Sequence, residues 1–592
     1  MTRVFAVTIR WTAVLFFAAV GTGTSAQEAP ARQGSEAPGL FFETVDVDVV
    51  NVEVFVTDRK GNAVTGLSKE DFILTVDGAE VAISNFYSEV LGRPVQDSAG
   101  VEVETLESEF EEAPPDQRLH LIVFVDNDNI RPTARKRVFK SLRDFLDSSL
   151  APEDYVTVAS SRKSVFTHSD FLKDRRTLNL VLDDIEKATG GDYTNMLEAR
   201  RIVSELSREG TSGIIVGDPI GDTAGALPAG NQRAILSRIQ AYAASEYQES
   251  RQSIAALGGF IDSIAGVPGR KAVLHVSGGI ATRPGEGMYL AFLDRFFGGT
   301  GEGSYYNDVG QFDLTPYMQD LGRRANAARV TFYALDADPN HASFLRSVET
   351  EGVAAQVNTS LRAEGALEAN YRQPLESMAH ATGGQRLYAG PSLGRQLSNI
   401  ATDFSTFYSL GFQATGKAAK ESHRIKVDLK KERGKGLRVR HRSDYTRRSR
   451  EDKMASATVA ALLYNSVDNP LEVSMNPGEG QKRDDGRMVV PVDLQIPLEN
   501  VTLLPNQGVH AARISLFVTV KNERGEARPV QKVPFALDIP DEFIERAKGD
   551  SARYTLPLII NPGDQQVAIG VRDEIGSNQS TLRIELPKGH QI

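Results

Sequence analysis

The chain has 592 residues, of which 41% are hydrophobic and 24% charged, and its formal net charge is −11. This length predicts several globular domains, and the negative charge argues against a general nucleic-acid-binding protein, which needs a basic face to neutralise phosphates. The chain has no cysteine, which excludes disulfides, a thiolate nucleophile and cysteine-ligated zinc.

The first 26 residues read as a signal peptide. Arg3 and Arg10 supply positive charge, residues 11–20 form a short apolar core, and Thr24-Ser25-Ala26 has the small residues of a cleavage site. The alternative is a membrane anchor, but the apolar core is shorter than the ~20 residues that span a bilayer. We therefore expect an exported protein, periplasmic or extracellular, with no transmembrane span after cleavage. A flexible tether is predicted at 27–40.

Residues 41–92 form a predicted N-terminal β-module. Residues 45–57 alternate between apolar and polar side chains, as a half-buried strand does. Residues 72–76, the pair Asp77-Gly78 and residues 81–86 follow as strand, tight turn and strand, which predicts a hairpin. The acidic, proline-containing stretch 93–117 is predicted to be a solvated linker.

Short apolar runs alternate with longer amphipathic segments between residues 118 and 405. This pattern is typical of a doubly wound, Rossmann-like α/β domain with a mostly parallel sheet. Two long loops interrupt it at 210–230 and 282–315, and loops of this length are usually functional or disordered. The predicted strands are 121–125, 155–160, 272–276, 330–335 and 385–388. The predicted helices are 133–148, 178–187, 194–207, 231–264, 317–328, 374–381 and 393–404.

Strand patterns return after the α/β domain. Those in 406–446 are expected to complete the N-terminal β-module. Residues 447–592 are predicted to be a linker and a C-terminal immunoglobulin-like β-sandwich, because several short strands are separated by regular turn signals.

Two carboxylates, Asp126 and Asp128, end the apolar run that begins at residue 120. Ligands of open α/β sheets bind outside the carboxyl ends of the strands, and carboxylates are oxygen ligands that Mg²⁺ accepts. Both residues also precede a predicted helix, where aspartate accepts backbone N–H bonds as a cap. A cation site and a helix cap therefore both remain open.

The central region resembles a von Willebrand factor type A domain. Such domains hold Mg²⁺ or Mn²⁺ with an Asp-x-Ser-x-Ser loop, a Thr on a second loop and an Asp on a third. In this sequence Asp126 matches, Asp128 and Ile130 replace the two serines, Thr194 falls on the threonine position, and Gly278 replaces the last aspartate. The resemblance therefore implies a degenerate metal-ion-dependent adhesion site.

The implied cofactor is Mg²⁺ or another divalent cation, and no other cofactor is expected. With one serine hydroxyl missing, binding should be weaker than in an intact site or absent. The implied ligands are Asp126, Asp128 and Thr194, and Asn127, Asp192 and Ser277 are expected at the rim or hydrogen-bonded to the ligands.

A wider resemblance covers residues 41–446. The runs 66–72, 381–384, 407–412 and 440–445 occur in the order seen in exported bacterial VWFA-related proteins of the acidobacterial type. This similarity implies that the strands before and after the α/β domain pack together, with the type A domain inserted between them.

We therefore expect an exported, non-enzymatic binding, adhesion or scaffold protein whose partners are other proteins of the envelope or extracellular matrix. A purely structural assembly protein without metal is one alternative. An exported hydrolase with an active site under the long loops is another, but the sequence has no His-Glu-x-x-His motif and shows no convergent set of a nucleophile, a base and oxyanion donors.

Two further features have a functional and a structural interpretation. The basic run 430–450 either contacts anionic lipid headgroups or an acidic polymer, or is a solvated strand face that balances the acidic stretch 102–116. His275 lies inside an apolar run, which favours a buried core residue over a ligand.

Overall fold

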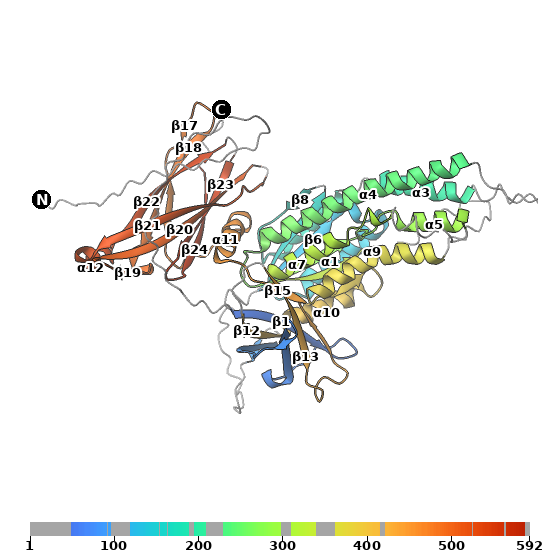
Figure 1. The fold of residues 1–592 in the computed structure, drawn as a ribbon, viewed down its shortest axis with the longest axis horizontal. Helices are drawn as coiled ribbons and strands as arrows, with labels where there is room; N and C mark the ends of the chain where they lie inside the picture. Colours follow the sequence, from blue (N-terminus) through green and yellow to red (C-terminus); the bar gives the residue numbers. More distant parts are fainter. Residues whose placement is uncertain are drawn as a thin grey trace, which may run out of the picture. The chain divides into compact units, whose positions relative to one another are not determined.

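The protein is described by a computed structural model, in which the chain divides into two compact units (Figure 1). The first holds mainly residues 450–592, and the second holds 51–412 and 417–449. The predicted signal peptide and tether, most of the linker, loop 210–230 and Asp192 lie outside the described residues. The structure describes residues 49–90, 93–95, 119–188 except 153 and 163, 194–208, 229–297, 309–338, 361–414, and 421–586 except 524, 562 and 563.

A six-stranded sheet forms the centre of the second unit, in the order β11-β10-β9-β6-β7-β8. All neighbours pair in parallel except β8, which is antiparallel to β7. The direction of winding reverses between β6 and β9, as in a doubly wound sheet. The predicted α/β fold is confirmed. The strands are β6 (Leu119–Asp126), β7 (Tyr155–Arg162), β8 (Ser164–Thr167), β9 (Arg270–Ser277), β10 (Val330–Asp336) and β11 (Arg386–Tyr388).

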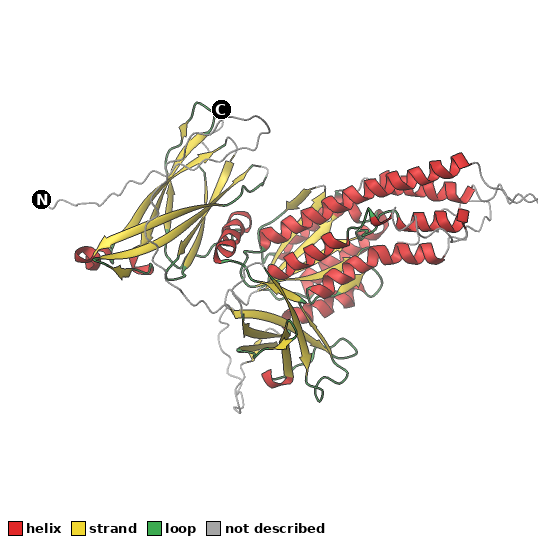
Figure 2. Cartoon of the chain, viewed as in Figure 1, coloured by secondary structure: helices red, strands yellow, loops and turns green. Residues whose placement is uncertain are grey.

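Helices cover both faces of this sheet (Figure 2), which explains why β6 and β9 are buried at every position. On one face, α1 (Pro132–Ser148), α2 (Arg175–Lys187) and α10 (Leu393–Ser405) share a core with alternate residues of β6, β9 and β10. The other face carries α4 (Ala229–Ile264), α7 (Thr315–Ala327) and α9 (Leu361–Ala381).

Two predictions for this domain were wrong. The predicted loop 282–315 contains the helix α5 (Glu286–Phe297), whose apolar residues pack in one core with α4 and α3 (Thr194–Arg208). The helix predicted at 374–381 begins at Leu361, because α9 continues through Pro374. Proline removes one backbone hydrogen bond, which normally marks a helix end, but packing on both sides outweighs that loss here.

Strands from before and after the α/β domain form a β-module of two sheets, β14-β1-β12-β4-β5 and β15-β13-β2-β3. Strand β1 pairs with β14, β4 with β12, and β2 with β13. Its strands are β1 (Val49–Thr57), β2 (Phe72–Val76), β3 (Ala79–Glu80), β4 (Asn85–Val90), β5 (Arg93–Val95), β12 (Phe407–Gln413), β13 (Ser422–Leu429), β14 (Arg438–His441) and β15 (Asp444–Thr446).

The predicted hairpin is shorter than expected. Asp77 and Gly78 form its turn with φ of 50° and 86°, the left-handed values that a two-residue hairpin requires. The returning strand β3 ends at Glu80, and the chain then crosses to the other sheet, where β4 pairs with β12. Strand β5 falls in the predicted linker 93–117 and pairs with β4.

Asp403 of α10 joins the β-module to the central sheet. Its Oδ1 accepts a hydrogen bond from Arg440 Nη2 of β14 at 2.7 Å. Its Oδ2 accepts from Tyr333 Oη of β10 at 3.2 Å and from Gln385 Nε2 at 3.1 Å. The residue is only 4% exposed, so these donors replace the water that a carboxylate loses on burial.

Three arginines reinforce the same joint. Arg270, at the start of β9, donates to the Phe404 carbonyl at 2.9 Å, and its guanidinium lies 3.5 Å from the ring centre of Phe407. Arg442 donates to the backbone carbonyls of Asn326 and Asn51 at 3.0 and 2.8 Å. Arg329 pairs with Glu53 at 3.1 Å.

The first unit contains two antiparallel sheets that share one hydrophobic core. Whether they form an immunoglobulin-like sandwich stays a prediction. One sheet comprises β16 (Ser474–Pro477), β17 (Gln481–Lys482), β18 (Met488–Pro497) and β22 (Ser551–Ile560). The other comprises β19 (Leu504–Asn506), β20 (Val509–Asn522), β21 (Gln531–Pro540), β23 (Asp564–Asp573) and β24 (Gln579–Glu585).

The predicted linker before this unit contains a helix, α11 (Arg450–Tyr464), which packs on β20, β23 and β24. A Cβ atom at Gly570 would overlap Met454 and Thr458 of this helix. The close approach explains a glycine in the middle of β23. No helix among the described residues is long and apolar enough to cross a membrane.

We expect Asp403→Ala to lower the free energy of unfolding of the second unit by about 3–5 kcal/mol, because the partly buried Arg440 would lose its carboxylate. The control is Asp320→Ala, which removes the exposed ion pairs with Arg323 and Arg324 and should cost less than about 1 kcal/mol. Urea unfolding followed by far-ultraviolet circular dichroism measures both. Equal losses would contradict the role of Asp403.

His275 should make stability depend on pH. It lies between Phe124 and Phe332, with ring centres 5.6 and 5.3 Å away, and burial lowers its pKa to about 4. An unfolded chain has a histidine pKa of about 6.5, so between these values it binds more protons than the folded chain. Stability should therefore fall by about 3 kcal/mol as the pH drops through this window.

The measurement is the free energy of unfolding in urea above and below this window. His275→Phe should flatten the pH dependence, because a phenyl ring fits between its two aromatic neighbours and does not titrate. The control is His380→Phe at an exposed site of α9, which should leave the slope unchanged. An unchanged slope in His275→Phe would show that another group is responsible.

Candidate functional site

Asp126 ends β6 at the carboxyl edge of the sheet, between β7 and β9, and is 3% exposed. Its Oδ1 accepts a hydrogen bond from Ser161 Oγ at 3.1 Å. Its Oδ2 accepts from Ser277 Oγ and from Asn129 Nδ2, both at 2.7 Å. Burial raises the pKa of Asp126, and these hydrogen bonds oppose the rise. Both oxygens are therefore engaged inside the protein.

Asn127 fixes the loop that follows β6. This loop is the short 3-10 helix η2 (Asn127–Asn129). The Asn127 side chain accepts from Arg135 Nη1 at 2.7 Å and donates to the Ala188 carbonyl at 3.2 Å, while Arg135 also donates to the Ile185 carbonyl at 2.7 Å. Asn127 thus ties η2 to α1 and to the end of α2.

At two positions of the type A motif, the residue in this chain has no side-chain oxygen that could bind a metal. Ile130, at the second serine position, is 1% exposed and belongs to the core between the sheet and α1. Gly278, at the position of the third-loop aspartate, lies against Asn129. A Cβ atom there would overlap the Asn129 carbonyl oxygen and lie 3.1 Å from its carbon. An aspartate at residue 278 requires the η2 loop to move.

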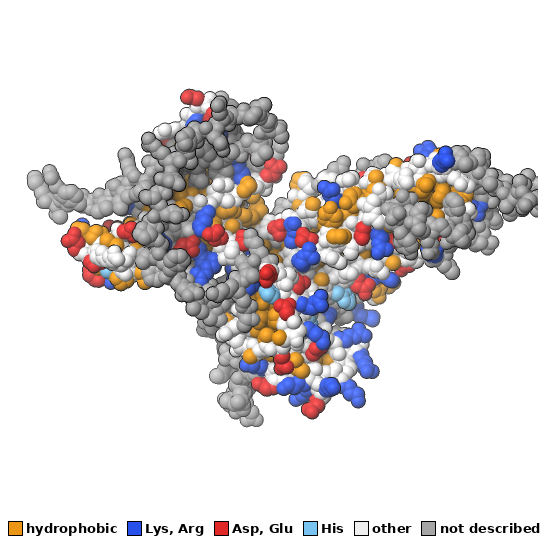
Figure 3. All heavy atoms as spheres, in the orientation of Figure 1, with side chains coloured by type: hydrophobic (Ala, Val, Ile, Leu, Met, Phe, Trp, Pro, Cys, Tyr) orange, Lys and Arg blue, Asp and Glu red, His pale blue; other side chains and the backbone are white. Residues whose placement is uncertain are grey.

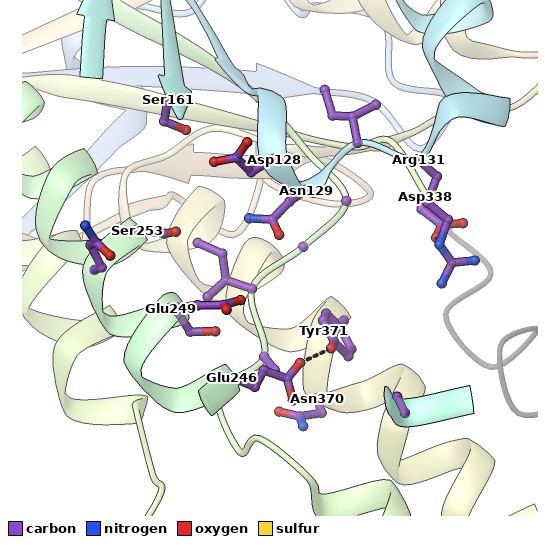
Figure 4. A pocket seen from close by; sticks show the side chains of 18 of the residues that line it. Asp128, Asn129, Arg131, Ser161, Glu246, Glu249, Ser253, Asp338, Asn370 and Tyr371 are labelled. Atoms are coloured by element: carbon purple, nitrogen blue, oxygen red, sulfur yellow. Dashed lines mark hydrogen bonds and ion pairs between the residues drawn. The ribbon is translucent and has the colours of Figure 1, made fainter. Parts of the chain in front are cut away.

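The described residues therefore do not fit the full type A ligand set. Asp128 faces a cavity beside the loop (Figure 4), whereas Asp126 is enclosed by three donors. Thr194 is the first residue of α3, but its side chain lies outside the described residues, as does Asp192. Among the residues that are described, no group of three or more His, Cys, Asp or Glu could hold a metal. The metal site stays a prediction.

A cavity of about 930 Å³ opens at this edge, between η2, the loop after β9, α4 and α9 (Figure 4). The crevice between β6 and β9 is where a doubly wound sheet binds ligands. Its lining mixes polar and apolar side chains, as small-molecule and peptide sites do. Lining residues include Asp128, Asn129, Ser161, Glu246, Glu249, Ser253, Ile280, Met288, Leu367, Asn370 and Tyr371.

Glu246 is an acidic residue of the cavity wall that two tyrosines hold in place. It accepts hydrogen bonds from the hydroxyls of Tyr371 and Tyr242, and burial raises its pKa. Asn370 shares the wall and is held by Arg283, since its Oδ1 accepts from the Arg283 N–H at 2.7 Å. No sequence pattern indicates these residues, because Glu246 of α4 and Tyr371 of α9 are 125 positions apart and form no motif.

Asp338, another acidic residue near η2, is neutralised by an ion pair. Arg131, just before α1, pairs with Asp338 through Nε and Oδ2 at 2.6 Å. Asp338 follows β10, so this ion pair joins the ends of two strands that are not neighbours in the sheet. It forms part of the cavity wall on the side away from Glu246 (Figure 4).

No protein-family model and no curated protein matches the chain. Among solved structures, an aerotolerance-related membrane protein from Bacteroides fragilis is similar at 8% identity and a TM-score of 0.22, over 48% of this chain and 98% of that one. The manganese-loaded TRAP protein from Plasmodium vivax is similar at 8% identity and a TM-score of 0.20, over 56% and 96%.

A von Willebrand factor type A protein from Catenulispora acidiphila is similar at 7% identity and a TM-score of 0.21, over 72% of this chain and 80% of that one. Similarity at this level carries no argument about function. The central α/β sheet rests on the strand order above, and membership of the type A family stays a prediction.

We expect Gly278→Ala to lower the free energy of unfolding by about 1–3 kcal/mol, because the added methyl group displaces the Asn129 carbonyl. The control is Gly365→Ala in α9, where nothing lies within 4 Å of the added Cβ atom. That change should stabilise the helix by about 0.5–1 kcal/mol. Urea unfolding measures both. If Gly278→Ala were as stable as the natural chain, the loop would have room for an aspartate.

Proposed function

We propose that the chain is an exported, non-enzymatic binding or scaffold protein that recognises a partner at the carboxyl edge of its central sheet. The supporting observation is the cavity of about 930 Å³ beside η2, at the point where the winding of the sheet reverses. The fold places this edge opposite the joint with the β-module, because Arg270 and Asp126 lie at opposite ends of their strands.

Recognition in this proposal relies on protein side chains. Asp126 already has three hydrogen-bond donors, and Gly278 leaves no space for a further carboxylate. The degenerate adhesion site would then be a site whose position is kept while its cation is no longer required. Polar groups such as Asp128, Glu249 and Asn370 would orient the partner, and Met288 and Leu367 would contact its apolar parts.

Export and partner class belong to the same proposal. The signal-like first 26 residues support export, and partners would be proteins of the envelope or extracellular matrix. A purely structural assembly protein remains the second candidate, with the two antiparallel sheets of the first unit as its contact surface. A hydrolase is less favoured, because the sequence has no His-Glu-x-x-His motif.

The absence of cysteine allows a direct test. A single cysteine placed by Ser253→Cys, on the cavity wall, can carry a photo-crosslinker. The matched control is Ser398→Cys, on the exposed face of α10. We expect covalent adducts with proteins of an envelope extract from the first variant only. They should persist in EDTA, because recognition uses side chains.

Three outcomes would contradict this proposal. Equal adducts from both positions would show that the cavity does not select a partner. No adduct at all would favour the structural assembly protein. Adducts that disappear in EDTA and return with Mn²⁺ would restore the metal-dependent adhesion site, with Asp128 as the first ligand to replace by alanine.

A further inference from the structure

The β-module carries exposed cations that its own fold does not use. Two segments supply them: the turn between residues 58 and 62, after β1, and residues 430–438, which form the turn between β13 and β14 and the first residue of β14. Figure 3 shows Lys and Arg side chains gathered over this module. We call the following six residues the basic tip: Arg59, Lys60, Lys430, Lys431, Lys435 and Arg438, all exposed.

Strand pairing brings the two segments together. Strand β1 is antiparallel to β14, with Thr57 opposite Arg438. The turn that follows β1 and the turn that precedes β14 therefore lie at the same end of the sheet. A Cβ atom at Gly436 would lie 3.5 Å from Arg59 Nε, which places the Arg59 guanidinium directly against the other turn. The tip is therefore one surface built from residues about 380 positions apart in a chain of 592.

The backbone of the tip is fixed. Within the second turn, the Gly434 N–H donates to the Lys430 carbonyl at 2.9 Å, and the Lys430 N–H donates to the Asp71 carbonyl at 2.9 Å. In the first turn, Asp58 accepts from the N–H groups of Lys60 and Asn62 at 2.7 and 2.9 Å. The cations are thus presented on ordered turns.

These cations have no ion-pair partner among the described residues, whereas their neighbours do. Arg433 pairs with Asp71 at 3.4 Å, and Lys426 pairs with Asp428 at 2.7 Å. Glu432 is the one acidic residue between positions 430 and 438. Clustering like charges disfavours folding slightly, even in a chain whose overall charge is −11. A partner with negative charge explains the arrangement.

We propose that the basic tip docks on an anionic lipid bilayer. Four of the six cations are lysines, which act as point charges and suit a diffuse charged surface better than a bidentate site. The two turns contain no aromatic residue on which a base or a sugar ring could stack. The basic tip is separate from the cavity, which lies at the carboxyl edge of the central sheet. Docking of the tip on a bilayer goes beyond the proposed recognition of a protein partner.

The experiment measures binding to vesicles of phosphatidylglycerol and phosphatidylcholine by co-sedimentation. The chain should begin at Gln27, because the apolar residues 11–20 would themselves enter a bilayer. The variant combines Lys430→Gln, Lys431→Gln and Lys435→Gln. The control combines Lys136→Gln, Lys140→Gln and Lys187→Gln on the exposed faces of α1 and α2, which removes the same charge.

We expect the natural chain and the control to bind the anionic vesicles and not pure phosphatidylcholine, more weakly as salt rises. The triple variant of the tip should bind on the order of 100-fold more weakly. Equal binding by both variants would overturn the proposal, and so would no binding by the natural chain. Binding to soluble polyglutamate but not to anionic vesicles would overturn it in favour of an acidic polymer.

Discussion

Burial of Asp403 is the constraint on which the arrangement of the second unit depends. A carboxylate that is 4% exposed must be surrounded by donors, and here they come from β10, from the segment before β11 and from β14 of the β-module. Arg270 and Arg442 add bonds to backbone carbonyls at the same joint. The joint occupies the amino edge of the sheet, where the chain enters and leaves the α/β domain. The carboxyl edge, which carries the cavity, remains uncovered by the module.

The sequence predicted what depends on local pattern. The alternation of strands and helices correctly indicated the doubly wound sheet, and the strand predicted at 121–125 lies within β6, which is buried at every position. It failed where packing overrides a local signal. Pro374 was read as a helix start, yet α9 runs through it, and the glycine-rich surroundings of α5 concealed a helix whose apolar residues meet α4. Helix α11 was read as linker because its partner, β23, lies about a hundred residues later.

The candidate site was also only partly predictable from the sequence. Its position at the end of β6 follows from sequence, since the run ends in Asp126 and Asp128. The donors that enclose Asp126 depend on the registry of β6 with β7, which places Ser161 beside it, and no residue spacing reveals that. The basic run 430–450 contains residues with two different roles, and only the three-dimensional structure distinguishes them. Arg440 and Arg442 turn inward and hold the joint, while Lys430 and its neighbours turn outward.

The contact between Gly278 and the Asn129 carbonyl has a consequence for how this site can change over generations. The two loops are coupled by steric exclusion, so substitutions in them are not independent. A mutation that introduced aspartate at residue 278 would be harmful unless the η2 loop had already shifted, and a shift of that loop alone breaks the hydrogen bond from Asn129 to Asp126. Each of these two changes is therefore disfavoured when it occurs alone. The same barrier applies in both directions, so residue 278 and the η2 loop would have to change together.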